Sequence, residues 1–413
     1  MPDADLRAPT QATAPRARLA LGALALGGFG IGTAEFAAMG LLPGIAADLG
    51  VSIPAAGHVI TAYAVGVVLG APALTALAAR WDRRTLLVAL MVTFTIGNLL
   101  SALAPTLEWL VVGRFFAGLP HGAFFGVGAV TGTAVVGPSR RGMAVATMMV
   151  GLTVANVVGV PLSTALGQRM GWQAAFVVVG VLGLATLLAL VRWIPTVPSA
   201  SDASIRREFS ALANGRLWTA FAAGSIGFGG MFAVYSYVAP LTTEVTGLAE
   251  RSVPWVLALF GIGMTVGTLV GGRVVDRSVV LAVRLGFVGT ILALLLVATT
   301  SATVAGALVS LVGLGVSSQV LGIALQARLM DLAPAAPSIG AALCHSALNA
   351  GNAAGAFLGG AVIAAGLGFL APAWVGLGLT VVGLAIVLVS GRLELRTGPA
   401  VPVDAARRVG ATP

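Results

Sequence analysis

The chain has 413 residues, of which 58% are hydrophobic and only 9% are charged, and its mean hydropathy is +1.01. A soluble domain carries roughly 25% charged residues, so this composition excludes a soluble enzyme or binding domain. The apolar runs are about 20 residues long rather than ten-residue alternating strands, which predicts a polytopic membrane protein built of helices.

The formal net charge of +9 comes entirely from arginine, because all 23 basic residues are Arg. Without lysine the chain has no Walker A loop and no Schiff-base amine, so ATP-driven transport and Schiff-base catalysis are excluded. The single cysteine, Cys344, allows no intramolecular disulfide and no cysteine-rich metal site. We therefore expect no enzyme activity, no cofactor and no metal site.

Taken in order, the apolar runs predict twelve membrane spans in two sets of six, and the fold class is all-α. The expected spans are 19–42, 54–78, 85–105, 107–134, 141–168, 172–194, 216–242, 252–275, 279–300, 302–327, 337–365 and 369–391. The implied domains are a disordered cytoplasmic tail at 1–17, a six-helix bundle at 18–194, a cytoplasmic linker at 195–215, a second six-helix bundle at 216–392 and a cytoplasmic tail at 393–413.

The arginines are distributed unevenly between the two sides of these spans. All but Arg114, Arg169 and Arg251 of the 23 fall on one side. Positively charged loops stay in the cytoplasm, so this pattern predicts a multi-pass plasma-membrane protein with both termini cytoplasmic, and the charge is not a nucleic-acid surface.

Two groups of residues recur at nearly equal separations in the two halves of the chain. Span 2 corresponds to span 8 and span 5 to span 11, through the pairs Gly70 and Gly267, Arg80 and Arg277, Asn156 and Asn352, and Gly159 and Gly355. Such a parallel duplication of six spans is typical of transporters.

Glu35 is the only acidic residue that falls inside an apolar segment. A carboxylate far inside hydrocarbon costs at least about 2.5–3.5 kcal/mol on insertion scales. It is either a structural group satisfied by a neighbouring helix or a proton-carrying or cation-binding group in a transport pathway. Glu35 lies in the outer half of its span.

Arg114 is the only base within a span, about seven residues or roughly 10 Å from the outer end of span 4. Because Glu35 has a similar depth, we expect the two charges either to neutralise each other or to share a water-filled cavity. The small residues Gly118, Gly122 and Gly126 follow Arg114 at four-residue spacing, which favours close helix packing.

The remaining polar groups within the spans are neutral. Hydrogen bonding between helices, worth roughly 0.6 kcal/mol on average, is one role for them. Contact with substrate in a central cavity is the other, and apolar side chains in spans 1, 4 and 7 supply an adaptable wall for hydrophobic molecules. The candidates for the cavity are Phe36, Met39, His121, Asn156, Tyr235, Asn349 and Asn352.

Four stretches together resemble the major facilitator superfamily, and within it the drug:proton antiporter group, in its arabinose-efflux-permease-like and chloramphenicol-exporter branch. They are Thr33 to Phe36 with Gly40 to Pro43, Gly70 to Arg84, Arg114 to Gly126, and Gly159 to Trp172. The resemblance covers about residues 19–392. It implies two pseudo-symmetric bundles, proton coupling by Glu35 and Arg114, and an antiporter motif at Gly159 and Pro161.

The resemblance also implies a cytoplasmic gating motif in the loop between spans 2 and 3, and here the chain departs from the family pattern. The family's Asp is replaced by Ala79, its first Gly by Thr75 and its later Gly by Asp82. The gating candidates are therefore Arg80, Asp82, Arg83 and Arg84 in the first half and Asp276 and Arg277 in the second.

The sequence thus predicts proton-coupled efflux of small, mostly apolar drugs or drug-like metabolites by alternating access. The expected partners are the substrate, protons and the lipid bilayer, with no nucleic acid, and a monomer as the default of the family. A proton-linked sugar or metabolite exporter, an uptake symporter and a non-transporting membrane receptor remain alternatives. The span 5 motif disfavours the symporter, and the paired charges disfavour the receptor.

Overall fold

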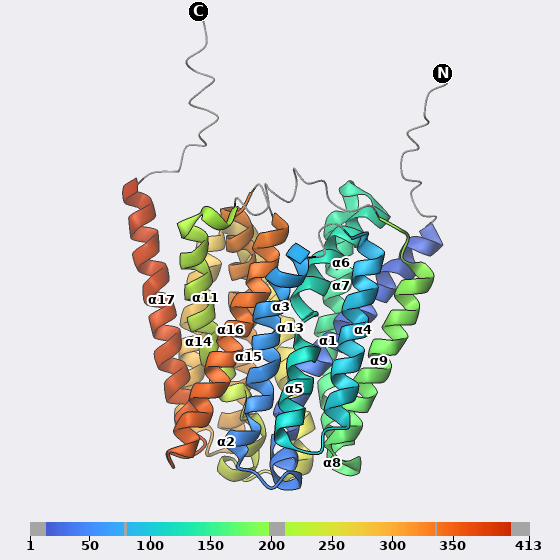
Figure 1. Cartoon of the computed structure of the whole chain (residues 1–413). Helices are drawn as coiled ribbons and strands as arrows, with labels where there is room; N and C mark the ends of the chain where they lie inside the picture. The colour runs from blue at the N-terminus through green and yellow to red at the C-terminus, as the bar shows by residue number, and fades with distance from the viewer. Residues whose placement is uncertain (1–13, 78–80, 198–210, 335–336, 398–413) are drawn as a thin grey trace, which may run out of the picture.

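The computed structural model describes residues 14–77, 81–197, 211–334 and 337–397, and among these it contains helices and no strands. Twelve helical spans are long and apolar enough to cross a membrane, which confirms the predicted all-α fold of two six-helix bundles. Their helices run alternately up and down, and α1 begins at the same end of the molecule where α17 ends (Figure 1).

The first bundle is formed by the helices up to α9 and the second by the helices from α11 onward. The first contains α1 (Ala14–Asp48), α2 (Ile53–Ala56), α3 (His58–Leu77), α4 (Arg83–Ala102), α5 (Leu107–Gly118), α6 (His121–Val136), α7 (Arg141–Val154), α8 (Val160–Met170) and α9 (Trp172–Trp193). The second contains α11 (Gly215–Tyr235), α12 (Val238–Pro240), α13 (Val253–Arg277), α14 (Val279–Thr300), α15 (Val304–Leu332), α16 (Pro337–Ala364) and α17 (Ala371–Thr397).

The ends of α1 and α17 differ from the sequence-based boundaries. Helix α1 begins at Ala14, inside the segment 1–17 that was expected to be a tail, and α17 continues to Thr397, past the expected end at 392. The rest of both expected tails, at 1–13 and 398–413, and residues 198–210 of the expected linker lie outside the described residues.

Four of the predicted spans are interrupted rather than continuous. Span 2 divides into α2 and α3 at Gly57. Span 4 divides into α5 and α6 at Pro120, whose ring nitrogen cannot donate a helical hydrogen bond. Span 5 divides into α7 and α8 at a π-helical turn, Ala155–Gly159. Span 7 ends at Tyr235 and continues in the short α12 and a second π-helical turn, Leu241–Val245. Such turns often mark functional positions in helices.

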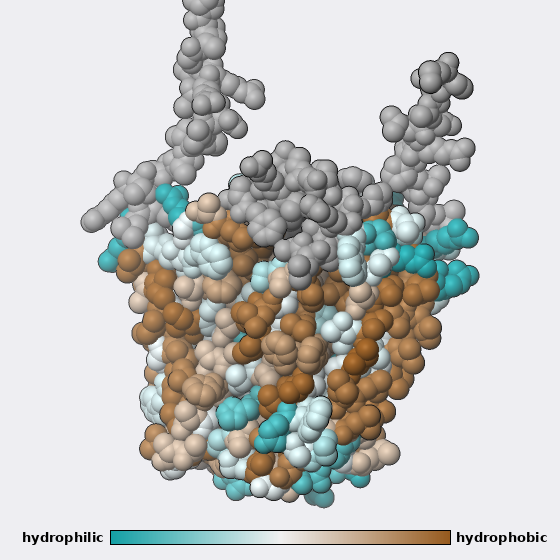
Figure 2. Space-filling view, in the orientation of Figure 1, coloured by the Kyte–Doolittle hydropathy of each residue, from teal (hydrophilic) through white to brown (hydrophobic). Residues whose placement is uncertain are grey.

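The surface is apolar around the flanks of the bundle and polar near its ends. Figure 2 shows hydrophobic side chains along the sides and hydrophilic ones near the two ends. Most of the arginines that the structure describes lie at helix ends at one end of the bundle, which we call the arginine-rich end, among them Arg16, Arg18, Arg83, Arg84, Arg140, Arg141, Arg192, Arg216, Arg273, Arg277, Arg284 and Arg328.

Glycines let α1 approach α7 and α8 at backbone distance. A Cβ on Gly151 would overlap the Ala25 carbonyl oxygen, and one on Gly159 would overlap the hydroxyl of Thr33. Small residues have this role throughout membrane helix bundles, because association there depends on close van der Waals packing. The contact holds α1, which carries Glu35, firmly against the interrupted helix pair.

The two halves use matching glycines for matching contacts, as the internal repeat predicts. Gly70 of α3 packs on the Leu119 carbonyl, and Gly267 of α13 packs on the Val316 carbonyl of α15. In the same way Gly159 faces α1, and Gly355 of α16 faces the Gly229 carbonyl of α11. The first and fifth spans of each half therefore pack together in the same way.

Two hydrophobic clusters each stay within one half, and a third crosses between them. The crossing cluster contains Phe36, Met39 and Leu42 of α1 together with Phe232 and Tyr235 of α11. The single cysteine, Cys344, is buried in the cluster confined to the second half. The two bundles thus share one apolar core toward the end opposite the arginines.

We expect Gly151→Ala to destabilise the protein, because the added methyl group overlaps the α1 backbone. Overpacking of this kind typically costs about 1–3 kcal/mol. Gly142→Ala on the same helix is the matched control, since nothing lies within 4 Å of its Cβ position. Thermal unfolding of both variants in detergent measures the difference, and an unchanged melting temperature for Gly151→Ala would contradict the close contact.

Candidate functional site: a central pocket above a buried charge cluster

A pocket of about 290 Å³ lies between the two halves at the arginine-rich end, and we call it the central pocket. It extends from Phe125 and His345 in the interior to Arg141, at the start of α7, and Met330, near the end of α15. Its lining is mostly apolar, and the residues are Phe125, Gly126, Ala129, Val130, Thr133, Arg141, Val145, Met148, Met149, Gln326, Met330, Ala341 and His345.

At the opposite end the two halves are closed by packed aromatic rings, which we call the aromatic plug: Phe36, Phe232, Tyr235 and Phe260. The Phe36 ring stacks on Phe232 with centroids 6.2 Å apart and meets Tyr235 edge-on at 5.7 Å. Tyr235 stacks on Phe260 at 4.1 Å. The predicted cavity residues Phe36 and Tyr235 therefore belong to the plug and lie outside the lining of the central pocket.

Glu35 is buried between the pocket and the plug, with a relative exposure of 6%. Its carboxyl lies against the side-chain amide of Asn349 on α16, across the interface between the halves. It is also close enough to Tyr63, Tyr235 and Arg114 to interact electrostatically with each of them. Glu35 thus faces both halves of the protein.

Arg114 is fully buried and is connected to α1 through the backbone. Its Nη2 donates a hydrogen bond of 2.8 Å to the carbonyl oxygen of Ala34, the residue before Glu35. The guanidinium carbon lies 4.3 Å from the centroid of the Tyr63 ring and 5.2 Å from that of Phe176. The Nε and Nη1 atoms are buried and have no hydrogen-bond partner among the described residues, so they remain available donors.

Glu35 and Arg114 therefore share one buried site without forming a direct ion pair. Among the described residues, no nitrogen of Arg114 lies within 4 Å of a carboxylate oxygen, and its hydrogen bond goes to the backbone. A direct ion pair is thus absent among the described residues, and the shared water-filled cavity stays a prediction. Small movements of α1 would change the distance between the two charges.

A row of polar side chains connects this charge cluster to the central pocket. The Tyr63 hydroxyl lies 3.2 Å from Nδ1 of His121, at the start of α6. The rings of His121 and His345 are 5.5 Å apart at their centroids, and the His345 ring stacks on Phe125 at 4.9 Å. His345 lines the central pocket, so a line of ionisable groups runs from Arg114 through Tyr63 and His121 to the pocket.

The predicted asparagines all lie near the interface between the halves. Asn349 and Asn156 each donate to the carbonyl four residues earlier in their own helix, at 3.2 and 3.0 Å, and their Oδ1 atoms have no partner in the described part of the chain. Asn352 is fully buried, and neither polar atom of its amide bonds to any residue that the structure describes. Buried amides without a hydrogen-bond partner are uncommon in proteins. These asparagines therefore remain candidates for contact with a ligand. Met39 is buried in the shared apolar core.

The predicted antiporter motif lies where α8 begins. Gly159 ends the π-helical turn and faces Thr33 on α1, and Pro161 lies within the first turn of α8, where its missing N–H is tolerated. The carbonyl oxygen of Asn156 in the same turn packs against Gly261 of α13. This turn is thus a contact between the two halves as well as a break in the helix.

At the arginine-rich end, the described gating residues of the first half form hydrogen bonds with nearby backbone groups. The Asp82 side chain accepts a 3.0 Å hydrogen bond from the Thr85 backbone N–H and caps the start of α4. The Arg83 backbone N–H donates to Val197, and the Arg84 guanidinium donates to Val191. Arg80 and Ala79 lie outside the described residues, and Asp276 and Arg277 are at the end of α13.

Tyr63 and the Ala34 carbonyl are site components that the sequence analysis did not single out. Tyr63 lies in an ordinary apolar stretch of α3, far along the chain from both Arg114 and His121. One available signal was its rarity, since the chain has only three tyrosines. Backbone carbonyls give no sequence signal at all.

Twelve membrane-spanning helices in two bundles around a central pocket define a membrane transporter rather than an enzyme. The sequence model of the Major Facilitator Superfamily matches residues 24–341, and the chain belongs to this family. The family membership also removes the receptor alternative.

Several curated relatives align over most of the chain. The inner membrane transport protein YdhP of Escherichia coli (strain K12) is 40% identical and covers 89% of this chain and 94% of the relative. The putative transporter AraJ of the same strain is 34% identical, covering 92% and 97%. A chloramphenicol resistance protein of Streptomyces lividans is also 34% identical, covering 91% and 96%.

Solved structures of low sequence identity share the fold. A bacterial homologue of the human lysosomal transporter Spinster, solved in an inward-facing and unoccupied conformation, has a TM-score of 0.71 at 16% identity, covering 94% of this chain and 100% of that one. A mutant form of the nucleoside transporter NupG has a TM-score of 0.68 at 14% identity, covering 91% and 99%.

We expect Asp82→Ala to lower stability by about 1 kcal/mol at neutral pH, because it removes the cap of α4. Hydrogen bonds from Thr85 lower the pKa of the Asp82 carboxyl. The stabilisation is therefore present above the usual pKa of Asp, about 3.9, and is lost as the pH falls through the lower folded value. Thermal unfolding between pH 7 and pH 3 measures the difference in stability between wild type and variant, which should shrink on acidification.

Asp276→Ala is the control, because it removes a carboxylate that caps no helix start. A stability difference between wild type and Asp82→Ala that stays constant across this pH range would contradict the charged cap.

Proposed function

We propose that the protein is a drug:proton antiporter that exports small, mostly apolar drugs or drug-like metabolites across the plasma membrane by alternating access. The observation that carries this proposal is the buried cluster of Glu35, Arg114 and Asn349 at the interface between the two halves. The 34% identical relative named as a chloramphenicol resistance protein supports the direction and the substrate class.

The arginine distribution supports an orientation with the arginine-rich end and both termini in the cytoplasm. In that orientation the central pocket opens inward and the aromatic plug closes the outer side. The structure then corresponds to the state that loads substrate from the cytoplasm. One copy of the chain contains the whole site, which supports a monomer as the working unit.

The lining of the central pocket suits a flexible range of apolar substrates. Met148, Met149 and Met330 supply unbranched, polarizable side chains that adapt to differently shaped ligands. Arg141 and Gln326 supply a few polar contacts that orient a ligand. A sugar exporter needs more hydroxyl-binding groups than this lining carries.

The coupling step uses the carboxyl of Glu35 as the proton carrier. In the outward-open state Glu35 takes up a proton, which weakens its attraction to Arg114 and to Asn349. In the inward-open state the proton leaves, and the carboxylate is attracted to the free donors Nε and Nη1 of Arg114. Each protonation state thus favours a different position of α1 relative to α5 and α16.

The helix interruptions and the loop at the arginine-rich end supply the moving parts of this mechanism. The turn that contains Gly159 and precedes Pro161 contacts both α1 and the second half. A rocking motion of one half against the other would therefore change the contacts of this turn. The gating role of Arg80, Asp82, Arg83, Arg84, Asp276 and Arg277 remains part of the proposal.

The decisive test uses inside-out vesicles with an imposed acid-inside gradient and a panel of amphiphilic drugs, beginning with chloramphenicol. Addition of substrate should raise the lumenal pH in wild type, because protons leave as the drug enters. Glu35→Gln should reduce this signal to that of vesicles without the protein, since the amide cannot carry a proton. Lumenal pH is followed with a trapped fluorescent indicator.

Glu244→Gln is the matched control, because Glu244 lies outside the Glu35 cluster, in the π-helical turn that follows α12. Its signal should equal that of wild type. A substrate-triggered signal that survives in Glu35→Gln would show that Glu35 is structural. No signal with any drug would reject the drug substrate class and direct the search to sugars and secreted metabolites.

The line of Tyr63, His121 and His345 further supports a route by which the proton reaches the cytoplasmic pocket. A neutral imidazole can accept a proton on one ring nitrogen and donate from the other, so adjacent imidazoles can relay one. We expect His345→Asn to slow substrate-triggered proton release by about a hundredfold or more, as is typical when a proton-transfer group is lost.

Drug–drug exchange, which needs no net proton movement, separates this role from substrate binding. It should remain at the wild-type rate in His345→Asn if the residue only conducts protons. The matched control is His58→Asn, since His58 is exposed at the opposite end of the bundle. Equal loss of exchange and of proton release would assign His345 to substrate binding instead.

A further inference from the structure

The central pocket contains one permanently charged side chain, and its charge is positive. Arg141, at the start of α7, is an exposed residue of the lining, and among the described lining residues there is no Asp or Glu. The other polar groups of the lining are Thr133, Gln326 and His345. The Thr133 hydroxyl already donates to the carbonyl oxygen of Ala129 in its own helix, at 2.8 Å. The pocket therefore presents positive charge, and no negative charge, to a ligand.

No carboxylate in the described part of the chain neutralises Arg141. Its guanidinium makes no hydrogen bond and no ion pair with any residue that the structure describes. The acids described at the same end, Asp82, Asp276 and Asp331, all lie outside the lining, and the last of them follows Met330 along the chain. Arg141 is therefore available to contact a ligand that enters the pocket.

The interior beneath the pocket does not reverse this sign. Among the described residues, Glu35 is the only buried acidic side chain and Arg114 the only buried guanidinium. When Glu35 is ionised, these two charges cancel and Arg141 remains. When Glu35 is protonated, both guanidinium groups remain. The charge of the pocket and the interior together is thus positive in both states, and Glu35 lies outside the lining, where a cation in the pocket cannot contact it.

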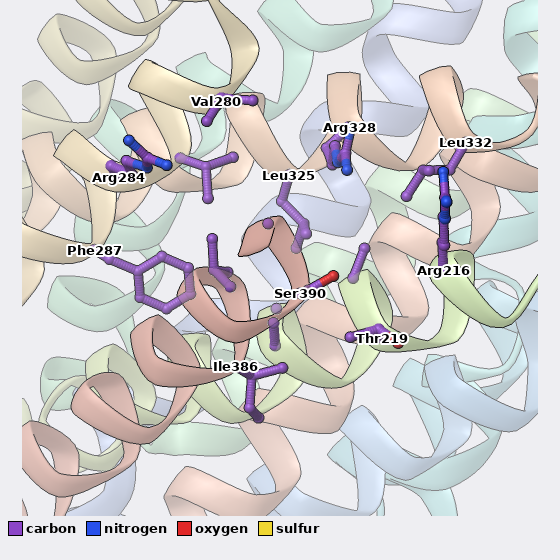
Figure 3. Close-up of a pocket in the computed structure, with 16 residues that line it drawn as sticks. Arg216, Thr219, Val280, Arg284, Phe287, Leu325, Arg328, Leu332, Ile386 and Ser390 are labelled. Atoms are coloured by element: carbon purple, nitrogen blue, oxygen red, sulfur yellow. The ribbon is translucent and has the colours of Figure 1, made fainter. Parts of the chain in front are cut away.

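The surface around the entrance of the pocket is also rich in arginine. Figure 3 shows three further arginines of this end, Arg216, Arg284 and Arg328, spread apart around a separate pocket of about 70 Å³ in the second half. Arg216 and Arg328 have interaction partners of their own, and Arg284 is exposed. Clefts lined by charge of one sign attract ligands of the opposite sign, so an organic anion is favoured over an organic cation on approach.

We propose that Arg141 makes the central pocket selective by charge, so that it accepts neutral and singly anionic amphiphiles and rejects organic cations. The anionic or hydrogen-bond-accepting group of the ligand lies on the Arg141 guanidinium, and its apolar body lies against Met148, Met149 and Met330. This selectivity rests on the proposed function, which makes the central pocket the site that loads substrate.

The membrane potential assists the export of this class of substrate. In the orientation proposed above, an anion leaves a cytoplasm that is electrically negative. Whatever the number of protons that enter, an anion in place of a neutral molecule adds one charge to each cycle. At 100 mV this charge changes the equilibrium accumulation ratio about fiftyfold in favour of export. A cation would lose the same factor.

The test measures the binding of three ligands that share one ring system and differ in charge. They are naphthalenesulfonate, naphthalenesulfonamide and naphthyltrimethylammonium, all substituted at the same ring carbon. Each is equilibrated by dialysis with the purified full-length protein in an uncharged detergent, and binding to protein-free micelles is subtracted. We expect the sulfonate to bind tightest, the sulfonamide to bind as well, and the ammonium to bind at least about tenfold more weakly than the sulfonate.

Substitution of Arg141 separates the effect of its charge from that of its shape. Arg141→Gln should weaken sulfonate binding about tenfold, to the level of the sulfonamide, and Arg141→Lys should keep the wild-type order. Arg141→Glu should reverse the order, so that the ammonium binds tightest. Because Arg141 is exposed, these changes disturb little packing.

Arg140→Gln is the matched control, since it removes the same charge from the adjacent exposed residue, which does not line the pocket. It should bind all three ligands like wild type. The proposal is overturned if the ammonium binds wild type as tightly as the sulfonate, or if Arg141→Gln keeps the wild-type order. Equal loss in Arg140→Gln, or no saturable binding of any ligand, would also overturn it. These binding constants need no proton movement, so a failure of antiport in the vesicle assay is a separate result.

Discussion

The hydrogen bond from Arg114 to the Ala34 carbonyl is the interaction around which the centre of the protein is arranged. A guanidinium cannot remain inside an apolar bundle without partners, because the cost of burying an isolated charge is many times that of a hydrogen bond. The bond joins α5 to α1 next to Glu35, and the Tyr63 and Phe176 rings cover the rest of the group. The position of the carboxyl is thus fixed through the backbone rather than by an ion pair.

That arrangement explains why the two ends of the bundle differ. Glu35 lies between the aromatic plug on one side and the histidine pair that leads to the central pocket on the other. Under the proposed proton coupling, Glu35 needs contact with both routes but free access to only one at a time. The glycine contacts between α1 and α7 bring the two backbones together. They therefore limit how far α1, and Glu35 with it, can move relative to α7.

The sequence predicts the fold almost completely, because long apolar runs and alternating arginines leave few other arrangements for a membrane protein. It also identifies Glu35 and Arg114, since a charge among apolar residues is conspicuous. It does not predict that they avoid a direct pair, because that depends on the Ala34 carbonyl and on Tyr63. The break at Pro120 could be anticipated, but the π-helical turn at Ala155–Gly159 arises from packing against α1 and α13 and leaves little local signal.

The aromatic plug has a thermodynamic consequence of its own. Phe36, Phe232, Tyr235 and Phe260 close the interface through ring stacking, without an ion pair among these four residues. Opening this end would transfer their surfaces into water and therefore carry a positive heat-capacity change, as exposure of apolar area does. The contribution of the plug to the balance between a closed and an open form of this end would then curve with temperature and depend only weakly on ionic strength.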